Sequence, residues 1–405
     1  MTKITDIPAI RFKGFSDTWE QRKLGEIGSV SMCRRIFKEQ TSENGEIPFY
    51  KIGTFGGEAD AFISRELFEE YKAKYQYPKK GDILISASGS IGRTVVFTGK
   101  NEYFQDSNIV WLNHDKHLDN SFLKCFYSIV KWAGIEGSTI KRLYNDNILN
   151  TAITLPSVEE QQKIGAYFEN LDNLITLHQR KYDKLTNVKK SMLEKMFPQN
   201  GSNAPEIRFK GFTEAWEQRK LGEMGQTYTG LSGKTKDDFG HGQARFVTYM
   251  NVFSNPISNP EMTEPIEIDP KQNEVEVGDV FFTTSSETPE EVGMSSILLE
   301  KRGKTYLNSF CFGFRPSEKI DSYYLAYMLR SESTRAKIIL LAQGISRYNI
   351  SKNKVMEIAV SLPSLDEQKM IGQYFSQLDN LITLHQRELE KLKNLKKACL
   401  EKMFV

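Results

Sequence analysis

The sequence is poor in the residues that mark secreted, zinc-binding or membrane proteins. Its 405 residues contain only four cysteines, Cys33, Cys125, Cys311 and Cys399, and their spacing fits neither a disulfide framework nor a zinc site. No apolar run approaches the roughly 20 residues that cross a bilayer, and no signal sequence is evident at the start. We therefore expect a cytoplasmic protein with reduced thiols and no membrane segment.

An excess of charge of one sign is also lacking. The chain has 54 basic and 52 acidic side chains, for a formal net charge of +2. A general binder of polyanions would be strongly basic, so any nucleic-acid surface must be local. The hydrophobic content of 39% is ample for real cores, and the length suits two to four modules.

The motifs of common enzymes are missing as well. Asn255-Pro256 and Asn259-Pro260 lack the second proline and aromatic residue with which amino-methyltransferases hold a flipped base. The segment Gly89-Ser-Ile-Gly92 lacks the lysine of a phosphate-binding loop. His114-x-x-His117 has no cysteine nearby and is more typical of a solvated loop than of a metal site. We therefore predict no catalytic residues, no bound cofactor and no metal ligands in this chain.

The sequence does contain a long internal repeat. Ten residues, Leu171–Arg180, recur unchanged at Leu378–Arg387. Each half also begins alike, with IRFKGFSDTWEQRKLGE from Ile10 and IRFKGFTEAWEQRKLGE from Ile207. A short polar run that starts at Pro198 separates the halves. A repeat of about two hundred residues indicates duplication of a whole domain rather than a solenoid array.

Each repeated decapeptide lies in a segment with the pattern of a long helix. Ser157-x-x-Glu160 and Ser364-x-x-Glu367 have the spacing of a capping box, in which serine and glutamate both bond backbone N–H groups. Apolar residues then follow in three- and four-residue steps. Forty residues at ~1.5 Å each make rods of roughly 60 Å, which need a partner to cover the apolar stripe. The other copy is the complementary surface, so we predict an antiparallel coiled coil about a pseudo-twofold axis.

The predicted seam includes one histidine in each copy, which we expect to meet near the pseudo-twofold axis and to favour a single register. The seam candidates are Leu171, Leu174, His178, Leu185, Leu378, Leu381, His385 and Leu392.

Between the shared ends the two halves diverge. The runs Ile47–Ile52, Arg245–Met250, Gly81–Ser86 and Gly278–Thr283 predict strands, and Ser121–Trp132 and Ser322–Leu341 predict helices. The fold class is therefore mixed α/β, with two duplicated α/β domains joined by two long helices. The predicted boundaries are domain 1 at 1–154, helix 1 at 155–197, a linker at 198–206, domain 2 at 207–361 and helix 2 at 362–405.

Polar, basic and aromatic residues gather in corresponding parts of both divergent regions. Arginine and lysine suit guanine edges and phosphates, asparagine suits adenine, and serine suits phosphates, which is the mixture that direct DNA readout needs. Any one such loop is weak evidence, but recurrence in both halves favours a DNA surface. The candidates are Arg34, Arg35, Ser88, Ser90, Arg93, Lys141, Arg142, Tyr144, Asn145, Tyr228, Lys234, Lys236, Ser285, Ser286, Ser346, Arg347, Tyr348 and Asn349.

With these motifs, the chain resembles the specificity subunits of type I restriction–modification systems. The segments LPSVEEQQKIG from Leu155 and LPSLDEQKMIG from Leu362 are the most specific mark, and the resemblance covers essentially the full length. It implies a non-catalytic subunit with two target-recognition domains, each followed by a spacer helix, that read the two parts of a bipartite, asymmetric target in double-stranded DNA. It also implies two modification subunits that methylate adenine and restriction subunits that cut. S-adenosylmethionine, ATP and Mg would then bind to those partners.

Two other interpretations stay open at this point. The chain could be a coiled-coil scaffold or adaptor whose two α/β domains bind proteins, and protection of specific DNA sequences would distinguish it. It could also modify DNA without partners, although the missing motifs argue against that. The target sequence itself cannot be read from side-chain identities alone.

Overall fold

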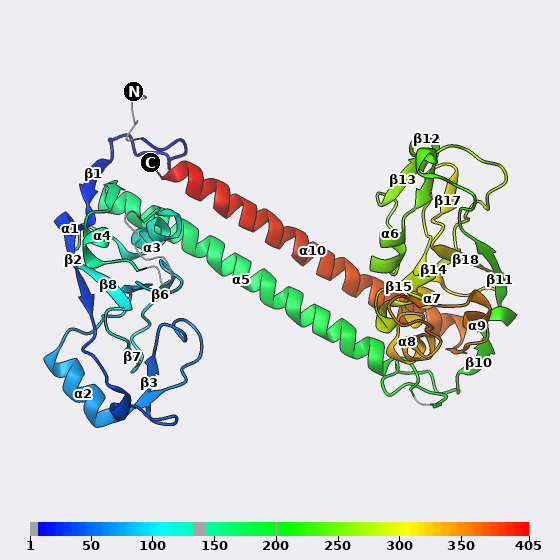
Figure 1. Cartoon of the computed structure of the whole chain (residues 1–405), viewed down its shortest axis with the longest axis horizontal. Helices are drawn as coiled ribbons and strands as arrows, with labels where there is room; N and C mark the ends of the chain where they lie inside the picture. The colour runs from blue at the N-terminus through cyan, green and yellow to red at the C-terminus, as the bar shows by residue number, and fades with distance from the viewer. Residues whose placement is uncertain (1–6, 133–141, 200, 405) are drawn as a thin grey trace. The chain divides into compact units, whose positions relative to one another are not determined.

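The structure is a computed structural model that describes residues 7–132, 142–199 and 201–404. The chain forms two compact units. Unit 1 comprises Met1–His178 and Glu388–Val405, and unit 2 comprises Gln179–Arg387. Each unit therefore contains one α/β domain with part of each long helix, α5 (Val158–Lys195) and α10 (Leu365–Met403) (Figure 1).

Unit 1 contains short helices and three small sheets besides its parts of α5 and α10. Its elements are β1 (Glu20–Lys23), α1 (Leu24–Ile27), β2 (Gly28–Met32), β3 (Ile47–Tyr50), β4 (Phe62–Ile63), α2 (Arg65–Lys74), β5 (Ile83–Ser86), β6 (Thr94–Val96), β7 (Tyr103–Phe104), β8 (Ile109–His114), α3 (Asn120–Ile129), α4 (Asn145–Leu149) and β9 (Ala152–Leu155). The strand orders are β2-β8-β5-β6, β4-β3-β7 and β1-β9.

Unit 2 repeats the sheets of unit 1 and adds one strand pair, whereas some of its helices differ. Its elements are β10 (Glu217–Lys220), β11 (Gly225–Thr229), β12 (Phe239–Val247), α6 (Tyr249–Ser254), β13 (Thr263–Ile266), β14 (Val280–Thr283), β15 (Ser285–Ser286), β16 (Ser295–Ile297), β17 (Thr305–Leu307), β18 (Cys311–Pro316), α7 (Ser322–Met328), α8 (Glu332–Ile339), β19 (Tyr348–Asn349), α9 (Lys352–Met356) and β20 (Ala359–Leu362). The orders β11-β18-β14-β16, β13-β12-β17 and β10-β20 match those of unit 1, and β15 pairs with β19. The predicted mixed α/β fold with two long helices is confirmed.

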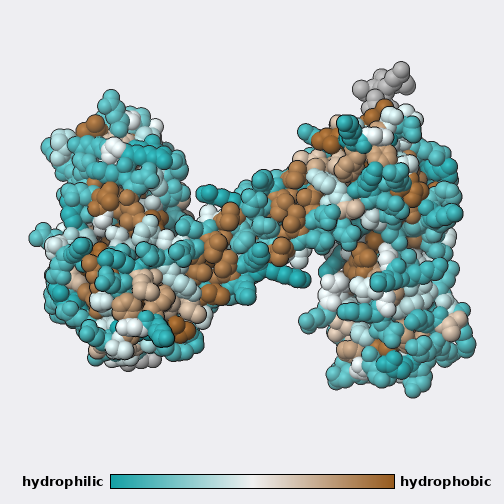
Figure 2. Space-filling model, turned by 180° about the vertical axis from the view of Figure 1, so that it is seen from behind, coloured by the Kyte–Doolittle hydropathy of each residue, from teal (hydrophilic) through white to brown (hydrophobic). Residues whose placement is uncertain are grey.

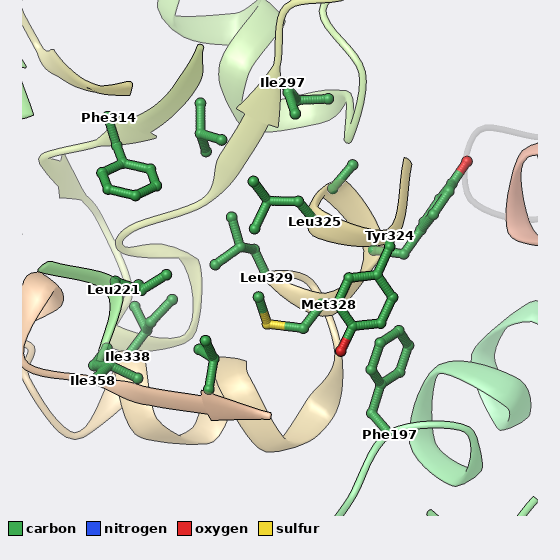
Figure 3. Packing of buried hydrophobic residues seen from close by; sticks show 14 of the residues in the cluster. Phe197, Leu221, Ile297, Phe314, Tyr324, Leu325, Met328, Leu329, Ile338 and Ile358 are labelled. Carbon is green, nitrogen blue, oxygen red and sulfur yellow. The ribbon is translucent and has the colours of Figure 1, made fainter. Parts of the chain in front are cut away.

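The main core of each unit lies where a four-stranded sheet, a short helix and the long helices meet. In unit 2, Phe197 just after α5 packs against Tyr324 of α7, with ring centroids 5.8 Å apart (Figure 3). Phe197 also packs against Phe375 of α10, with centroids 5.9 Å apart. In unit 1, Phe404 after α10 stacks on Phe122 of α3 at 5.1 Å. Packing of these aromatic side chains anchors each α/β domain to the long helices.

Within each unit the two long helices run antiparallel. In unit 1, Lys396 Nζ of α10 lies 2.5 Å from Asp172 Oδ1 of α5, and Tyr167 contacts Cys399 at 3.5 Å. In unit 2, Lys189 Nζ of α5 lies 2.5 Å from Asp379 Oδ1 of α10. The predicted antiparallel pairing is therefore present inside both units, with the same ion pair in each.

The predicted seam residues differ in burial. Leu171 and Leu378 are buried, whereas Leu174 and Leu381 are 43% and 44% exposed. Leu185 packs against the core of unit 2 and Leu392 against that of unit 1. His178 belongs to unit 1 and His385 to unit 2, so their approach to each other stays a prediction.

The starts of α5 and α10 differ from the predicted capping box. Ser157 Oγ does accept from Glu160 N at 3.3 Å, as Ser364 Oγ does from Glu367 N at 3.4 Å. The glutamate carboxylates, however, are fully buried and bind arginines near the start of each half. Arg11 donates to Glu160 at 2.7 and 2.8 Å, and Arg208 to Glu367 at the same distances. A bidentate, charge-assisted pair is stronger than a bond to a neutral amide, so the expected return bond to the serine N–H was the wrong role for these glutamates.

The strand predicted over Ile47–Ile52 ends at Tyr50 and the helix predicted over Ser121–Trp132 ends at Ile129. Two further predicted elements end early because a new helix cap follows. The strand expected through Met250 stops at Val247, because Thr248 accepts from Asn251 N and caps α6. The single helix expected over Ser322–Leu341 is two helices, α7 and α8, because Ser331 caps a new start by accepting from Thr334 N. Among the described residues, no helix is long and apolar enough to cross a membrane.

Candidate nucleic-acid interface

In unit 1, three segments of the chain come together beyond the end of β5. They are 87–93 after β5, 105–108 before β8, and 142–145 at the start of α4, and we call them the loop surface of unit 1. Leu143 N donates to Ala87 O at 2.8 Å, and Ser88 Oγ donates to Asn108 Oδ1 at 2.8 Å. Arg142 Nη2 donates to Ser107 O at 3.4 Å. Two of the three segments were predicted, and the structure joins them through the third.

The first segment is a tight turn built on Ser86. Its hydroxyl accepts from Arg93 N at 2.9 Å and donates to Ser90 O. Gly89 and Gly92 adopt φ values of +65° and +80°, which side chains with a Cβ rarely adopt. The turn holds Ser90 and Arg93 exposed, while Ser88 is only 9% exposed. Ser88 therefore shapes the turn, and Arg93 is the group that can reach a ligand.

The third segment carries an arginine and a tyrosine side by side. The Arg142 guanidinium lies 5.7 Å from the centroid of the Tyr144 ring, which is 50% exposed. Asn145 is exposed at the first turn of α4. An arginine over an aromatic ring offers both a charged fork and a flat apolar face. Lys141, also a candidate, lies outside the described residues.

Arg34 and Arg35 reach this region through the second segment. Arg35 Nε lies 3.7 Å from Asp106 Oδ2, and the Arg34 guanidinium lies 5.2 Å from the ring centroid of Tyr75. Both arginines are exposed. Asp106 therefore moderates the positive charge of Arg35, while Arg34 extends the basic surface toward α2.

Unit 2 has the same backbone arrangement with different side chains. Its loop surface comprises 284–288, 307–310 and 346–350. Ile350 N donates to Thr284 O at 2.9 Å, as Leu143 does to Ala87 in unit 1. Thr284 N donates to Phe310 O at 2.9 Å, as Ala87 N does to Asn108 O at 2.7 Å.

The candidates on the loop surface of unit 2 divide into buried and exposed groups. β15 pairs with β19, so that Ser285 lies opposite Asn349 and Ser286 opposite Tyr348. The serines are 5% and 6% exposed, and so they shape the surface. The exposed groups are Ser346, Arg347 and Asn349, with Tyr348 half-buried. The Arg347 guanidinium lies 5.8 Å from the centroid of Phe310, which is 54% exposed.

Two other candidates in unit 2 are committed to buried or paired contacts. Tyr228 donates its hydroxyl to Asp279 at 2.5 Å beneath the Arg315 guanidinium, and burial raises its pKa above the ordinary value. Lys234 Nζ lies 2.8 Å from Asp269 Oδ2, and this contact raises the lysine pKa. These contacts use the polar groups of Tyr228 and Lys234 inside unit 2. Lys236, by contrast, is exposed.

Sequence reasoning missed the middle segment of each loop surface. Gln105–Asn108 and Leu307–Phe310 contain no basic residue, and a search for basic and aromatic clusters passes over them. Gln105 Oε1 accepts from Ile52 N at 2.9 Å and so fixes another loop beside the surface. The one available signal is Asp106-Ser-Asn, a sequence typical of a turn before a strand.

The exposed side chains of the two loop surfaces are suited to binding. Exposed arginines can donate to phosphates or to base edges in a groove, and the aromatic rings beside them add apolar contact. Within residues 7–132, 142–199 and 201–404, no three His, Cys, Asp or Glu side chains are grouped to hold a metal. His114 instead contacts Asn120 Oδ1 at 2.8 Å, and His117 contacts Asp115 Oδ2 at 2.8 Å.

Known proteins are similar to this chain in sequence and in fold. A family model described as the type I restriction modification DNA specificity domain matches residues 16–187 and again residues 213–394. A putative type I restriction enzyme specificity subunit of Haemophilus influenzae is 60% identical over 158 residues, which are 38% of this chain and 41% of that protein. A putative type I restriction enzyme MjaX specificity subunit of Methanocaldococcus jannaschii is 25% identical over 424 residues, covering 98% and 93%. The crystal structure of a type I restriction-modification system S subunit from M. genitalium matches with a TM-score of 0.57 at 16% identity, covering 98% and 99%, which shows the same fold.

Proposed function

Because the chain belongs to the type I restriction–modification DNA specificity family, whose role is to select DNA, we propose that each of its two units reads one part of a bipartite, asymmetric sequence in double-stranded DNA. The observation that carries the proposal is the matched pair of loop surfaces. The same backbone bonds, Leu143 to Ala87 and Ile350 to Thr284, present different exposed side chains in the two units. Matched geometry with unlike side chains is what two readers of two different sequences require.

Within each loop surface we assign the reading roles to the residues that are not buried. In unit 1 these are the exposed Arg93 and Tyr144 and the half-buried Arg142, and in unit 2 the exposed Arg347 and Asn349. Arginine suits guanine and asparagine suits adenine in the major groove. The buried serines Ser88, Ser285 and Ser286 set the backbone from which those side chains project.

The chain assembles with other subunits of a restriction–modification complex, and we propose two modification subunits and restriction subunits as those partners. Leu174 and Leu177 of unit 1 are 43% and 46% exposed, and the equivalent Leu381 and Leu384 of unit 2 are 44% and 52% exposed. Apolar surface lies along the long helices (Figure 2). Two like apolar patches suit two copies of one partner. S-adenosylmethionine, ATP and Mg would bind to the partners, and a cytoplasmic location stays a prediction.

The test is to sequence methylated adenines in a host that expresses this chain with its modification subunits. The expected result is a motif of two specified parts separated by unspecified bases. A single contiguous motif would contradict the reading by two units. DNA protection by the purified complex is the companion measurement, and complete absence of sequence-specific protection would favour a scaffold that binds proteins.

A further inference from the structure

Unit 1 contains a cavity that is distinct from its loop surface and that the proposed reading of DNA does not use. It has a volume of about 350 Å³ and lies between β6, α3, the first part of α5 and the last part of α10. One side is apolar, with Ile83, Val96 and Phe168. The other side carries Asp172, whose carboxylate holds Lys396 at 2.5 Å and Lys124 at 3.4 Å.

The duplication allows this cavity to be compared residue by residue with the same place in unit 2. Asp119 N donates to Gln161 Oε1 at 2.8 Å before α3, and Asp321 N donates to Gln368 Oε1 at 3.0 Å before α7. These matched bonds align α3 with α7. Cys125 of α3 therefore corresponds to Tyr327 of α7. The ion pair Asp172–Lys396 likewise corresponds to Asp379–Lys189.

In unit 2 a tyrosine occupies the corresponding place. The Tyr327 hydroxyl donates to Asp379 Oδ2 at 2.8 Å, and Lys189 Nζ lies 5.5 Å from the centroid of its ring. The ring packs on Phe375 with centroids 5.1 Å apart and is 1% exposed. Asp379, Lys189 and Phe375 together form a binding site for a phenol ring. In unit 2 the side chain of Tyr327 occupies that site.

The next turn of the helix shows the same replacement of a small residue by a large one. Ser128 lines the cavity of unit 1, and its counterpart in unit 2 is the half-buried Arg330. Arg330 donates to Ser295 O at 2.7 Å and to Val252 O at 2.9 Å, and burial lowers its pKa to about 9. Unit 1 therefore lacks both large side chains that fill this region in unit 2.

We infer that the cavity of unit 1 is a binding site for a phenolic ring. The hydroxyl donates to Asp172, whose carboxylate has acceptor positions beyond the two used by the lysines. The ring lies against Phe168 with the Lys396 ammonium beside it, as Tyr327 lies between Phe375 and Lys189. The site is distinct from the loop surface, and its existence does not depend on the proposed DNA function.

A phenol satisfies both sides of the cavity at once. A hydrocarbon would leave the aspartate without the hydrogen bond that Tyr327 makes in unit 2, and a small polar molecule would leave the apolar side in contact with water. Such a ring could belong to a free small molecule or to a tyrosine of another chain. The two sources share the chemistry, and they differ in the groups attached to the ring.

The direct test is equilibrium dialysis of the full chain with labelled p-cresol, the side-chain analogue of tyrosine. We expect one bound molecule per chain and binding at least tenfold tighter than that of toluene, because a hydrogen bond to a charged acceptor contributes about that factor. N-acetyltyrosine amide distinguishes the sources: binding of both probes indicates a mouth that admits a peptide, and binding of p-cresol alone indicates a small-molecule site. Absence of p-cresol binding, or equal binding of toluene, would overturn the inference.

The duplication supplies matched variants. Cys125→Tyr copies unit 2 into unit 1 and should reduce p-cresol binding by more than tenfold. Ser128→Phe blocks the cavity from an exposed position, where folding is not at risk, and should have the same effect. Tyr327→Cys opens the matching place in unit 2 and should raise the stoichiometry from one to two. Unchanged p-cresol affinity in both blocking variants would place the ligand elsewhere and refute the site.

Discussion

The two units share one framework in the regions where their sequences repeat. They differ in the side chains of their loop surfaces. Arg11 and Glu160 in unit 1 have the same two bond lengths, 2.7 and 2.8 Å, as Arg208 and Glu367 in unit 2. The loop surfaces share backbone bonds but not side chains, with Tyr144 and Arg142 in one and Arg347 beside Phe310 in the other. A fixed frame with exchangeable surface groups allows one fold to carry two different specificities.

The largest expected effect comes from exchanging one loop surface entirely. Replacing residues 29–154 by the corresponding region of another specificity subunit should change one part of the methylated motif and leave the other intact. The reason is that this segment contributes every residue of the loop surface of unit 1 and none of that of unit 2. Sequencing of methylated adenines is the measurement, and a simultaneous change in both parts of the motif would refute independent reading.

The contribution of the buried arginine–glutamate pairs to this framework can be tested at the same place in both units. Arg11→Met and Arg208→Met each leave a buried glutamate without its partner, and breaking such a pair costs about 3–5 kcal/mol. Glu160 and Glu367 are both 0% exposed, so the two losses should be alike in urea unfolding.

A matched control for the buried pairs lies on the surface of unit 1. Arg22 forms a pair with Glu20 at 2.9 Å, with side chains 42% and 64% exposed. Arg22→Met should therefore lower the free energy of unfolding far less than Arg11→Met does, because solvent screens an exposed pair. If Arg11→Met and Arg22→Met had equal effects, the buried pairs would not hold the frame together.

The frame was largely predictable from the sequence because its signals are local. The serine caps and the apolar stripes of α5 and α10 depend on residues three or four positions apart. The partner of Glu160 was not predictable, because Arg11 lies 149 positions away and the capping-box spacing offered the glutamate a nearby alternative.

The candidate site was predicted less completely than the frame. Arg142 and Arg347 could be found from basic clusters, but their neighbours on the loop surfaces depend on which strands pair. The segments 105–108 and 307–310 were missed for that reason. Tyr228 and Lys234 carry the side chains expected of a DNA surface, yet tertiary contacts with Asp279 and Asp269 use those groups inside unit 2.

Arginine substitutions compare the two loop surfaces at the level of single contacts. Arg93→Ala in unit 1 and Arg347→Ala in unit 2 should each cost ~1–3 kcal/mol of binding and relax preference at one base position if the side chain reads a base edge. Each would then alter a different part of the target. Binding assays over a range of salt concentrations measure this, since loss of a phosphate contact weakens all sequences alike and reduces the salt dependence. If both variants kept the DNA affinity, base preference and salt dependence of the parent chain, these arginines would not be part of the interface.

The smallest expected effect concerns the glutamines that join each recognition domain to its long helix. Gln161 accepts from Asp119 N at 2.8 Å and donates to Pro156 O and His117 O, both at 3.0 Å. Gln368 accepts from Asp321 N at 3.0 Å and donates to Pro363 O at 2.9 Å. Both side chains are buried, at 1% and 5% exposure, so substitution by alanine leaves buried polar groups unpaired in either unit.

Unit 1 should lose more from this substitution than unit 2. Gln161 makes one bond more than Gln368 does within the described residues, and a net hydrogen bond contributes about 0.5–1.5 kcal/mol. We therefore expect Gln161→Ala to lower the free energy of unfolding by about 1 kcal/mol more than Gln368→Ala. Urea unfolding of the two variants, each compared with the parent chain, gives this difference. Equal losses would mean that the bond to His117 O contributes nothing. The hydrogen bonds of Gln161 and of Gln368 would then stabilise their units equally, despite their different partners.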